Sequence, residues 1–183
     1  MMFARTSRLT LRPAWPEDAA ALSHAIGHEQ VVKMLSRVPW PYALGDAQDF
    51  LSRPRASTEA FFLILSHEQD YPRIVGGMGI HPEAGAGHEF GYWLTPSAWG
   101  RGYATEAGRA VVAIARHALG LKRLNAGHFI DNPASGRVLT KLGFRATGRV
   151  EPRHSRARGG EAPCAVFELD LDEGRTCDVK MAA

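Results

Sequence analysis

The stretch that decides the fold is Trp99-Gly100-Arg101-Gly102-Tyr103-Ala104-Thr105-Glu106-Ala107, a glycine-rich turn that runs into a helix. Glycine lets phosphate oxygens approach the main chain closely and makes positive φ angles accessible. Apolar residues then recur at helical spacing as far as Leu119, and Gly120 is typical of a C-cap. Unpaired N–H groups and the positive end of the helix dipole therefore meet at the turn. This arrangement predicts a pyrophosphate socket.

Two other interpretations compete for this turn. Its glycines could serve backbone geometry alone, or the turn could belong to a Rossmann dinucleotide fold. A Rossmann loop has the pattern Gly-x-Gly-x-x-Gly after the first strand and an acidic residue about 20 positions further on. Here the pattern is Gly-x-Gly-x-Ala in the middle of the chain, and residues 118–122 contain no carboxylate. The Rossmann interpretation is therefore the weaker one.

A second motif follows about thirty residues later. It reads Asn132-Pro133-Ala134-Ser135-Gly136-Arg137-Val138-Leu139-Thr140-Lys141-Leu142-Gly143-Phe144. Residues 122–130 before it alternate as a strand, Asp131 and Asn132 are a typical N-cap pair, and proline suits the first helical position. The motif predicts a short helix that ends at Gly143.

The two motifs, in this order, resemble signatures of the GNAT superfamily of acyl-CoA N-acyltransferases, in particular its RimJ/RimL-like branch of ribosomal-protein N-terminal acetyltransferases. The resemblance covers nearly the whole chain. The family pattern Arg/Gln-x-x-Gly-x-Gly/Ala binds the coenzyme A pyrophosphate and falls here on Trp99, Gly102 and Ala104. Trp99 departs from the usual Arg or Gln, which removes one polar side chain but leaves the main-chain socket intact.

The resemblance and the apolar patterning predict an α+β GNAT fold in the order β-αα-βββ-α-β-α-ββ. We expect a mixed, mostly antiparallel sheet of about seven strands with helices on both faces, in one domain spanning 1–183 with a core at 8–171 and a short tail at 172–183. The expected strands are 8–12, 59–65, 73–80, 88–94, 122–130, 144–150 and 165–171, and the first two helices are 16–27 and 46–51. In the family the fourth and fifth strands splay apart to admit the pantetheine arm.

Composition bounds the class of protein. The 183 residues are 45% hydrophobic and 22% charged, with a formal net charge of +3, which suits one globular domain and gives no reason to expect nucleic acid. No run of eighteen apolar residues and no leader are apparent, so we expect a cytoplasmic protein without a membrane partner.

Metal-ligand and disulfide patterns are weak. Cys164 and Cys177 are too few for a disulfide framework, and Cys164 is expected to be a core thiol in a strand. His24 and His28 have helical metal-ligand spacing, but Gly27 between them should end the helix. We therefore expect no metal.

The resemblance implies acetyl-CoA as the cosubstrate and assigns residues to its site. The cofactor-binding residues are expected to be Trp99, Gly100, Arg101, Gly102, Tyr103, Ala104, Thr105, Asn132 and Ser135, together with the main chain of Tyr92, Trp93 and Leu94. The main chain at residues 92–94 would also polarise the thioester carbonyl, as an oxyanion hole does.

The implied chemistry is direct attack of an amine on the acetyl thioester. Glu89 is the first candidate for the catalytic base, and His81 or His88 could take its place. Ser135 is the candidate proton donor to the departing thiolate, because the matching serine of the branch lies near the coenzyme sulfur. Ser135 could instead serve only the first turn of its helix.

The acceptor is less clearly encoded. Trp40 and Tyr42, in a Pro-flanked loop, either bind substrate together with Glu89 or only cover the core. The basic stretch 149–160 is expected to be a solvated hairpin loop, with recognition of an acidic substrate or RNA as alternatives. The resemblance favours a protein or peptide α-amine. A small-molecule amine acetyltransferase and a non-catalytic acyl-CoA sensor remain alternatives, and a homodimer is one expected assembly because the family often forms dimers.

Overall fold

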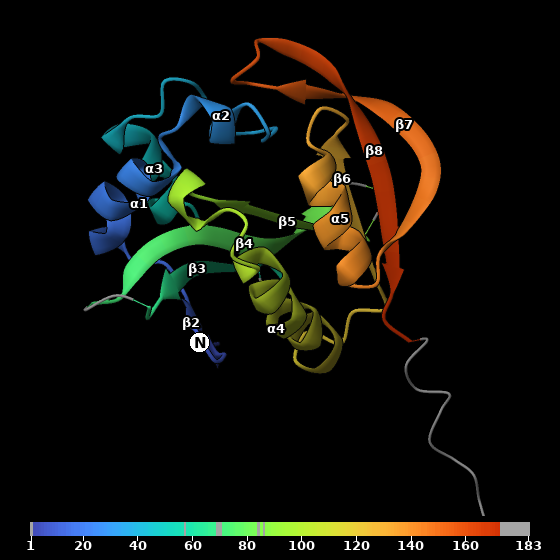
Figure 1. Ribbon diagram of the computed structural model, residues 1–183, viewed down its shortest axis with the longest axis horizontal. Helices are drawn as coiled ribbons and strands as arrows, with labels where there is room; N and C mark the ends of the chain where they lie inside the picture. Colours follow the sequence, from blue (N-terminus) through green and yellow to red (C-terminus); the bar gives the residue numbers. More distant parts are fainter. Residues whose placement is uncertain (1, 57, 69–70, 84, 86, 173–183) are drawn as a thin grey trace, which may run out of the picture.

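An eight-stranded sheet in the order β1-β2-β3-β4-β5-β6-β8-β7 runs through the computed structural model, which describes residues 2–56, 58–68, 71–83, 85 and 87–172 (Figure 1). Neighbouring strands are antiparallel except for β5 and β6, which are parallel. The strands are β1 Ala4–Arg5, β2 Leu9–Arg12, β3 Ala60–Ser66, β4 Arg73–Glu83, β5 Gly87–Leu94, β6 Arg123–Phe129, β7 Arg145–Ser155 and β8 Gly160–Asp170.

Helices cover both faces of this sheet, so the predicted α+β architecture with a mixed, mostly antiparallel sheet is confirmed. They are α1 Ala19–Ile26, α2 Glu29–Val32, α3 Leu44–Ser52, α4 Tyr103–His117 and α5 Pro133–Lys141, with 3₁₀ turns η1 Pro16–Asp18 and η2 Pro96–Ala98. Strand alternation sends Phe62 and Ile64 of β3 into the core under α4 and α5, and Leu63 into a second core with α1 and α3. Each face therefore has its own apolar core.

The sheet divides between β5 and β6. These two strands share one register pair, Glu89 opposite Asn125, whereas β4 pairs with β5 from Gly76–Leu94 to Glu83–Gly87. Beyond Glu89 the edge of β5 that faces β6 lacks a ladder partner. The predicted fourth and fifth strands, residues 88–94 and 122–130, are β5 and β6 of the structure, so the predicted splay is present.

The basic stretch 149–160 differs from the prediction. It is not a loop: β7 continues to Ser155, β8 begins at Gly160, and only residues 156–159 form the turn. β7 is the outer strand of the sheet, where charged residues and proline are tolerated because one edge faces solvent. The two-residue strand β1 and the one-turn helix α2 were also absent from the prediction.

Other expectations hold within the described residues. Helix α1 ends at Ile26 with Gly27 as its C-cap, and Cys164 is a buried thiol in β8. Cys177 and residues 173–183 of the expected tail lie outside the described part of the chain. No helix of the described chain is long and apolar enough to cross a membrane.

Candidate active site

A cavity of about 1320 Å³ lies where the sheet divides. Residues 91–94 of β5 line it on one side, residues 127–129 of β6 line it on the other, and the start of α4 and one face of α5 contribute further walls. Typical small-molecule sites measure roughly 300–1,000 Å³, so this cavity has room for two reactants.

The glycine-rich turn forms one end of the cavity. Gly100 and Gly102 have φ of 73° and 79°, values that a side chain would strain, and Gly102 is the N-cap of α4. The amide of Glu106 is bonded to the carbonyl of Gly102 at 3.0 Å, so the amides of residues 103–105 precede the first helical bond. Free amides therefore gather at a helix N-terminus beside the cavity, which is the geometry of an anion socket.

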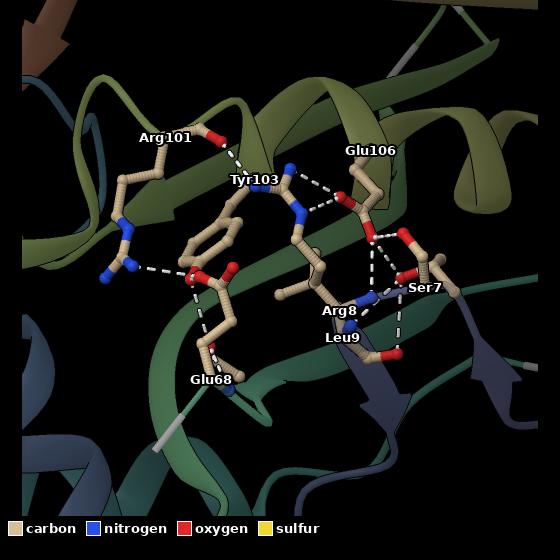
Figure 2. Close-up of polar contacts among 9 residues, drawn as sticks. Ser7, Arg8, Leu9, Glu68, Arg101, Tyr103 and Glu106 are labelled. Atoms are coloured by element: carbon tan, nitrogen blue, oxygen red, sulfur yellow. Dashed lines mark hydrogen bonds and ion pairs between the residues drawn. The ribbon is translucent and has the colours of Figure 1, made fainter.

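A half-buried ion pair between Arg8 and Glu106 supports this turn (Figure 2). Glu106 accepts hydrogen bonds from the Thr6 hydroxyl at 2.6 Å, from the Arg8 amide at 3.0 Å and from Arg8 Nε at 2.8 Å. Arg8 also donates to the carbonyl of Arg101 at 3.0 Å. Burial raises the pKa of Glu106, but these bonds outweigh it and bring the pKa to about 2. The carboxylate is thus ionised and neutralised by Arg8.

The side chains of two predicted cofactor residues, Arg101 and Tyr103, both contact Glu68. The Tyr103 hydroxyl is bonded to Ser66 and Glu68, and its ring is 1% exposed. The Arg101 guanidinium pairs with Glu68 at 2.9 Å, as Figure 2 shows. Tyr103 borders the cavity, whereas Arg101 is not among the described residues that line it.

The side chain of Trp99 makes a contact that the family pattern did not predict. Its indole Nε1 donates to the carbonyl of Leu94 at 2.9 Å, and the ring is 48% exposed at the cavity edge. The side chain therefore links the end of β5 to the glycine-rich turn. This bond uses the Leu94 carbonyl. Because the Thr95 amide donates to the Val75 carbonyl of β4 and alternate residues of a strand bond the same neighbour, Trp93 bonds β4 and the main-chain groups of Tyr92 face the gap.

Ser135 and Tyr92 meet inside the cavity. The Tyr92 hydroxyl lies 3.0 Å from Ser135 Oγ and donates to it. Burial raises the pKa of Tyr92, more than the bond to Ser135 lowers it, so the phenol stays protonated. Asn132 caps α5 by accepting from the Ser135 amide at 3.3 Å. The Ser135 hydroxyl proton is therefore free to be donated elsewhere.

Glu89 is the centre of a charged cluster at the other end. It is 8% exposed; its Oε2 lies 3.0 Å from Nε2 of His81, its cross-strand partner, and its Oε1 contacts Nη1 of Arg153. Burial raises the pKa of Glu89, but the bond from His81 and the charge of Arg153 together bring the pKa below its ordinary value. His88 is not among the residues that line the cavity, whereas His81, Glu89 and Arg153 are.

The two aromatic residues of the Pro-flanked loop lie in different environments. Tyr42 lines the cavity, and burial together with the charge of Asp46 raises the pKa of its phenol to about 12. Trp40 is 41% exposed and is not among the described residues that line the cavity.

Hydrogen bonds join the β7–β8 turn to the segment after α2. We call this contact the strap. Ser155 Oγ donates to the carbonyl of Leu35 at 2.9 Å. The amide of Arg156 donates to the carbonyl of Ser36 at 3.0 Å. Arg158 donates to the carbonyl of Lys33 at 2.7 Å and holds Asp131 with two bonds of 2.9 and 3.0 Å. Residues on both sides of the strap line the cavity, so the strap fixes this wall.

The chemistry-bearing groups are thus arranged along one cavity, from an anion socket through a serine–tyrosine pair to a carboxylate–imidazole–guanidinium cluster. No group of three or more His, Cys, Asp or Glu side chains able to hold a metal is found in the described part of the chain. The model of the acetyltransferase (GNAT) domain matches residues 8–145. The chain belongs to the GNAT acetyltransferase family. It is an acyl-CoA-dependent N-acetyltransferase.

Known relatives agree with this assignment. The chain is 29% identical over 154 residues to an uncharacterized N-acetyltransferase, YoaA, of Bacillus subtilis, covering 78% of this chain and 82% of the relative. The solved structure of Mycobacterium smegmatis RimJ in complex with CoA-disulfide is 25% identical, with a TM-score of 0.75 over 90% of this chain and 83% of that one. A ribosomal-protein-S5-alanine acetyltransferase from Vibrio fischeri shares the fold, with a TM-score of 0.79 at 15% identity over 94% and 98% of the two chains.

Arg153, Arg158 and Arg8 were missed as site residues in the sequence. The first two lie in the stretch that had been interpreted as a solvated loop. Strand alternation could have shown that Arg153 and Ser155 share a face, but not that this face turns toward Glu89.

We predict that Glu106→Gln lowers the free energy of unfolding by about 2 kcal/mol at neutral pH, because it removes a charged acceptor of several bonds. A carboxylate with a lowered pKa stabilises the fold above its unfolded pKa and loses this effect as pH falls through its folded pKa. The deficit should therefore shrink between pH 4.5 and about 2. Urea unfolding at several pH values measures it, with the exposed Glu17→Gln as control, and an equal deficit at pH 7 and pH 3 would contradict the prediction.

We predict that Arg158→Ala loosens the strap. Loss of its bonds to Lys33 and Asp131 should lower the free energy of unfolding by about 2 kcal/mol. It should also speed hydrogen exchange of the Arg156 amide, which is bonded across the strap. Arg156→Ala is the matched control on the same turn, because its side chain makes only a 3.5 Å contact with the Arg37 carbonyl. Equal effects of the two variants would show that Arg158 does not hold the strap.

Proposed function

We propose that this protein transfers an acetyl group from acetyl-CoA to the α-amine of a protein or peptide N-terminus. The observation that carries the proposal is the continuous cavity in the split sheet, which has an anion socket at one end and a buried, ionised Glu89 at the other. The coenzyme pyrophosphate would lie on the amides of residues 103–105. The pantetheine arm would lie along Tyr92 and Trp93 in the gap between β5 and β6.

The acceptor end favours an α-amine over a lysine. An α-amine has a pKa of about 8 and a lysine amine about 10.4, so at neutral pH roughly one α-amine in ten is neutral against fewer than one lysine in a thousand. Glu89 is held as a carboxylate by Arg153 and has a lowered pKa, so the cluster around it is a weak base. A weak base is enough for an amine that is already partly neutral.

The departing thiolate would receive its proton from Ser135. The amine attacks the carbonyl carbon, the tetrahedral intermediate collapses, the C–S bond breaks, and the sulfur takes the hydroxyl proton of Ser135. Tyr92 donates to the same oxygen and would pass its own proton to Ser135 as the serine proton leaves, so that no serine alkoxide is formed; the proton that the amine loses returns to the phenol through solvent. Asn132 would keep Ser135 in place through the helix cap.

Membership of the RimJ/RimL-like branch is part of the proposal. It is supported by the wording of the two sequence motifs and by the likeness to RimJ from Mycobacterium smegmatis and to the ribosomal-protein-S5-alanine acetyltransferase. A cytoplasmic location and a homodimer accord with this branch and belong to the same proposal.

The test is release of coenzyme A thiol from acetyl-CoA with separate pools of acceptors. Free N-terminal peptides should be turned over. The same peptides with a blocked N-terminus and an internal lysine should not, and this pair is the matched control. Turnover confined to polyamines, amino acids or aminoglycosides would overturn the acceptor assignment and leave the family assignment in place.

We predict that Ser135→Ala lowers kcat by about 10²-fold, the range expected for loss of a positioned proton donor. The Kd for acetyl-CoA should not change, because Asn132 bonds the Ser135 amide and the helix cap is kept when the side chain is removed. Tyr92→Phe should have a smaller effect, since the serine hydroxyl remains. Steady-state kinetics with calorimetric binding separate the two constants, and an unchanged kcat in Ser135→Ala would remove the serine from the reaction.

A further inference from the structure

His81, Glu89 and Arg153 come from three different strands and touch in one chain of contacts. His81 on β4 and Glu89 on β5 are direct register partners, and Arg153 reaches Glu89 from β7. The side chains of His81 and Arg153 are 24% and 29% exposed, against 11% for Glu89. His81 and Glu89 both line the cavity, and the imidazole is the more exposed of the two groups.

Both oxygens of Glu89 are occupied. Oε1 is engaged by the guanidinium of Arg153, which is always charged, and Oε2 faces Nε2 of His81. A proton placed on Glu89 would break an ion pair that is largely withdrawn from solvent, and such pairs are costly to break. Glu89 is therefore built to remain a carboxylate throughout the reaction.

The same contact fixes the tautomer of His81. An ionised carboxylate can only accept a hydrogen bond, so Nε2 of His81 must carry the hydrogen that points at Oε2. In the neutral imidazole the lone pair then lies on Nδ1. A carboxylate that orients an imidazole and stabilises its protonated form is the arrangement by which serine hydrolases activate a histidine base.

We propose that His81 is the group that takes the proton from the attacking amine, and that Glu89 and Arg153 are positioning residues that act through it. The nitrogen of the acceptor forms the C–N bond to the acetyl carbon while one N–H bond breaks and its proton passes to Nδ1 of His81. The resulting imidazolium is paired with the Glu89 carboxylate. This inference rests on the proposed amine transfer but not on which amine is used.

The other ionisable groups near His81 come from the neighbouring strands, and each has a partner or is neutral. Glu83 of β4 pairs with Arg153 at 3.5 Å and accepts from Asn125 of β6 at 3.4 Å. Glu59, next to the β3 residue Ala60 that pairs with Ile80, is held by Arg53 at 3.0 Å. Cys164 of β8 also lines the cavity, and burial raises the pKa of its thiol, which keeps it neutral. Glu89 is thus the carboxylate that contacts His81 directly.

The test combines variants with pH–rate profiles. His81→Gln keeps an amide that can donate to Glu89 but has no titratable nitrogen, so kcat/KM should fall by about 10²-fold or more, and the acid limb of its profile should lose the step that His81 contributes and keep only the ionisation of the amine substrate. The Kd for acetyl-CoA should not change, which checks folding. Glu89→Gln removes the charge that favours the protonated imidazole, so its acid limb should move to lower pH. The exposed His24→Ala, on α1 outside the cavity, should match the wild type.

Two results would overturn the inference. The first is a wild-type kcat/KM in both His81→Gln and His81→Ala, while Glu89→Gln loses the enzyme step of the acid limb and keeps only the ionisation of the amine. This result would make Glu89 the base. The second comes from long-range ¹H–¹⁵N NMR of the wild-type protein at neutral pH, where an Nδ1–H tautomer of His81 would contradict the required Nε2–H form. The NMR measurement needs no acceptor. It therefore tests the tautomer of His81 even if no amine pool gives turnover, a result that would overturn the proposed function.

Discussion

The structure depends on the one main-chain pair, Glu89 opposite Asn125, at which the two parts of the sheet meet. At this pair β5 is bonded on both sides, and elsewhere its ladder runs with β4. Unpaired main-chain groups in a protein interior are costly unless something bonds them. The unpaired edge of β5 therefore suits a ligand that can bond it as an extra strand would. The split between β5 and β6 also forms the walls of the cavity.

Side chains reinforce the same junction. Glu89 reaches His81 within the first part of the sheet and Arg153 in the second. The residue that ends the pairing of β5 with β6 thus also joins the two parts through its carboxylate. A change at Glu89 acts on both fold and site, which is why His81, whose removal leaves the Glu89–Arg153 contact in place, is the more informative residue to vary.

The geometry of the glycine-rich turn and of the α5 cap could be predicted because its signals are local. Positive φ at Gly100 and Gly102, and the capping of α5 by Asn132, depend on residues a few positions apart. The acceptor half could not be predicted in this way. Arg153 meets Glu89 across 64 residues of chain, Arg8 meets Glu106 across 98, and Arg158 meets Lys33 across 125. No periodicity shows which distant strand will supply a charge, so a basic edge strand resembled a solvated loop.

The two arginine–carboxylate pairs have related electrostatic consequences. Arg8 cancels the charge of Glu106 in the first turn of α4, so this carboxylate does not oppose an anion at the nearby amides. Arg153 cancels the charge of Glu89 at the acceptor end. A lone buried carboxylate would stabilise the ammonium form of an incoming amine and raise the pKa of that amine, which would remove the lone pair needed for attack. In the proposed reaction Arg153, which Glu83 also contacts, offsets part of this negative charge, so the incoming amine is less strongly protonated and keeps the lone pair that attacks.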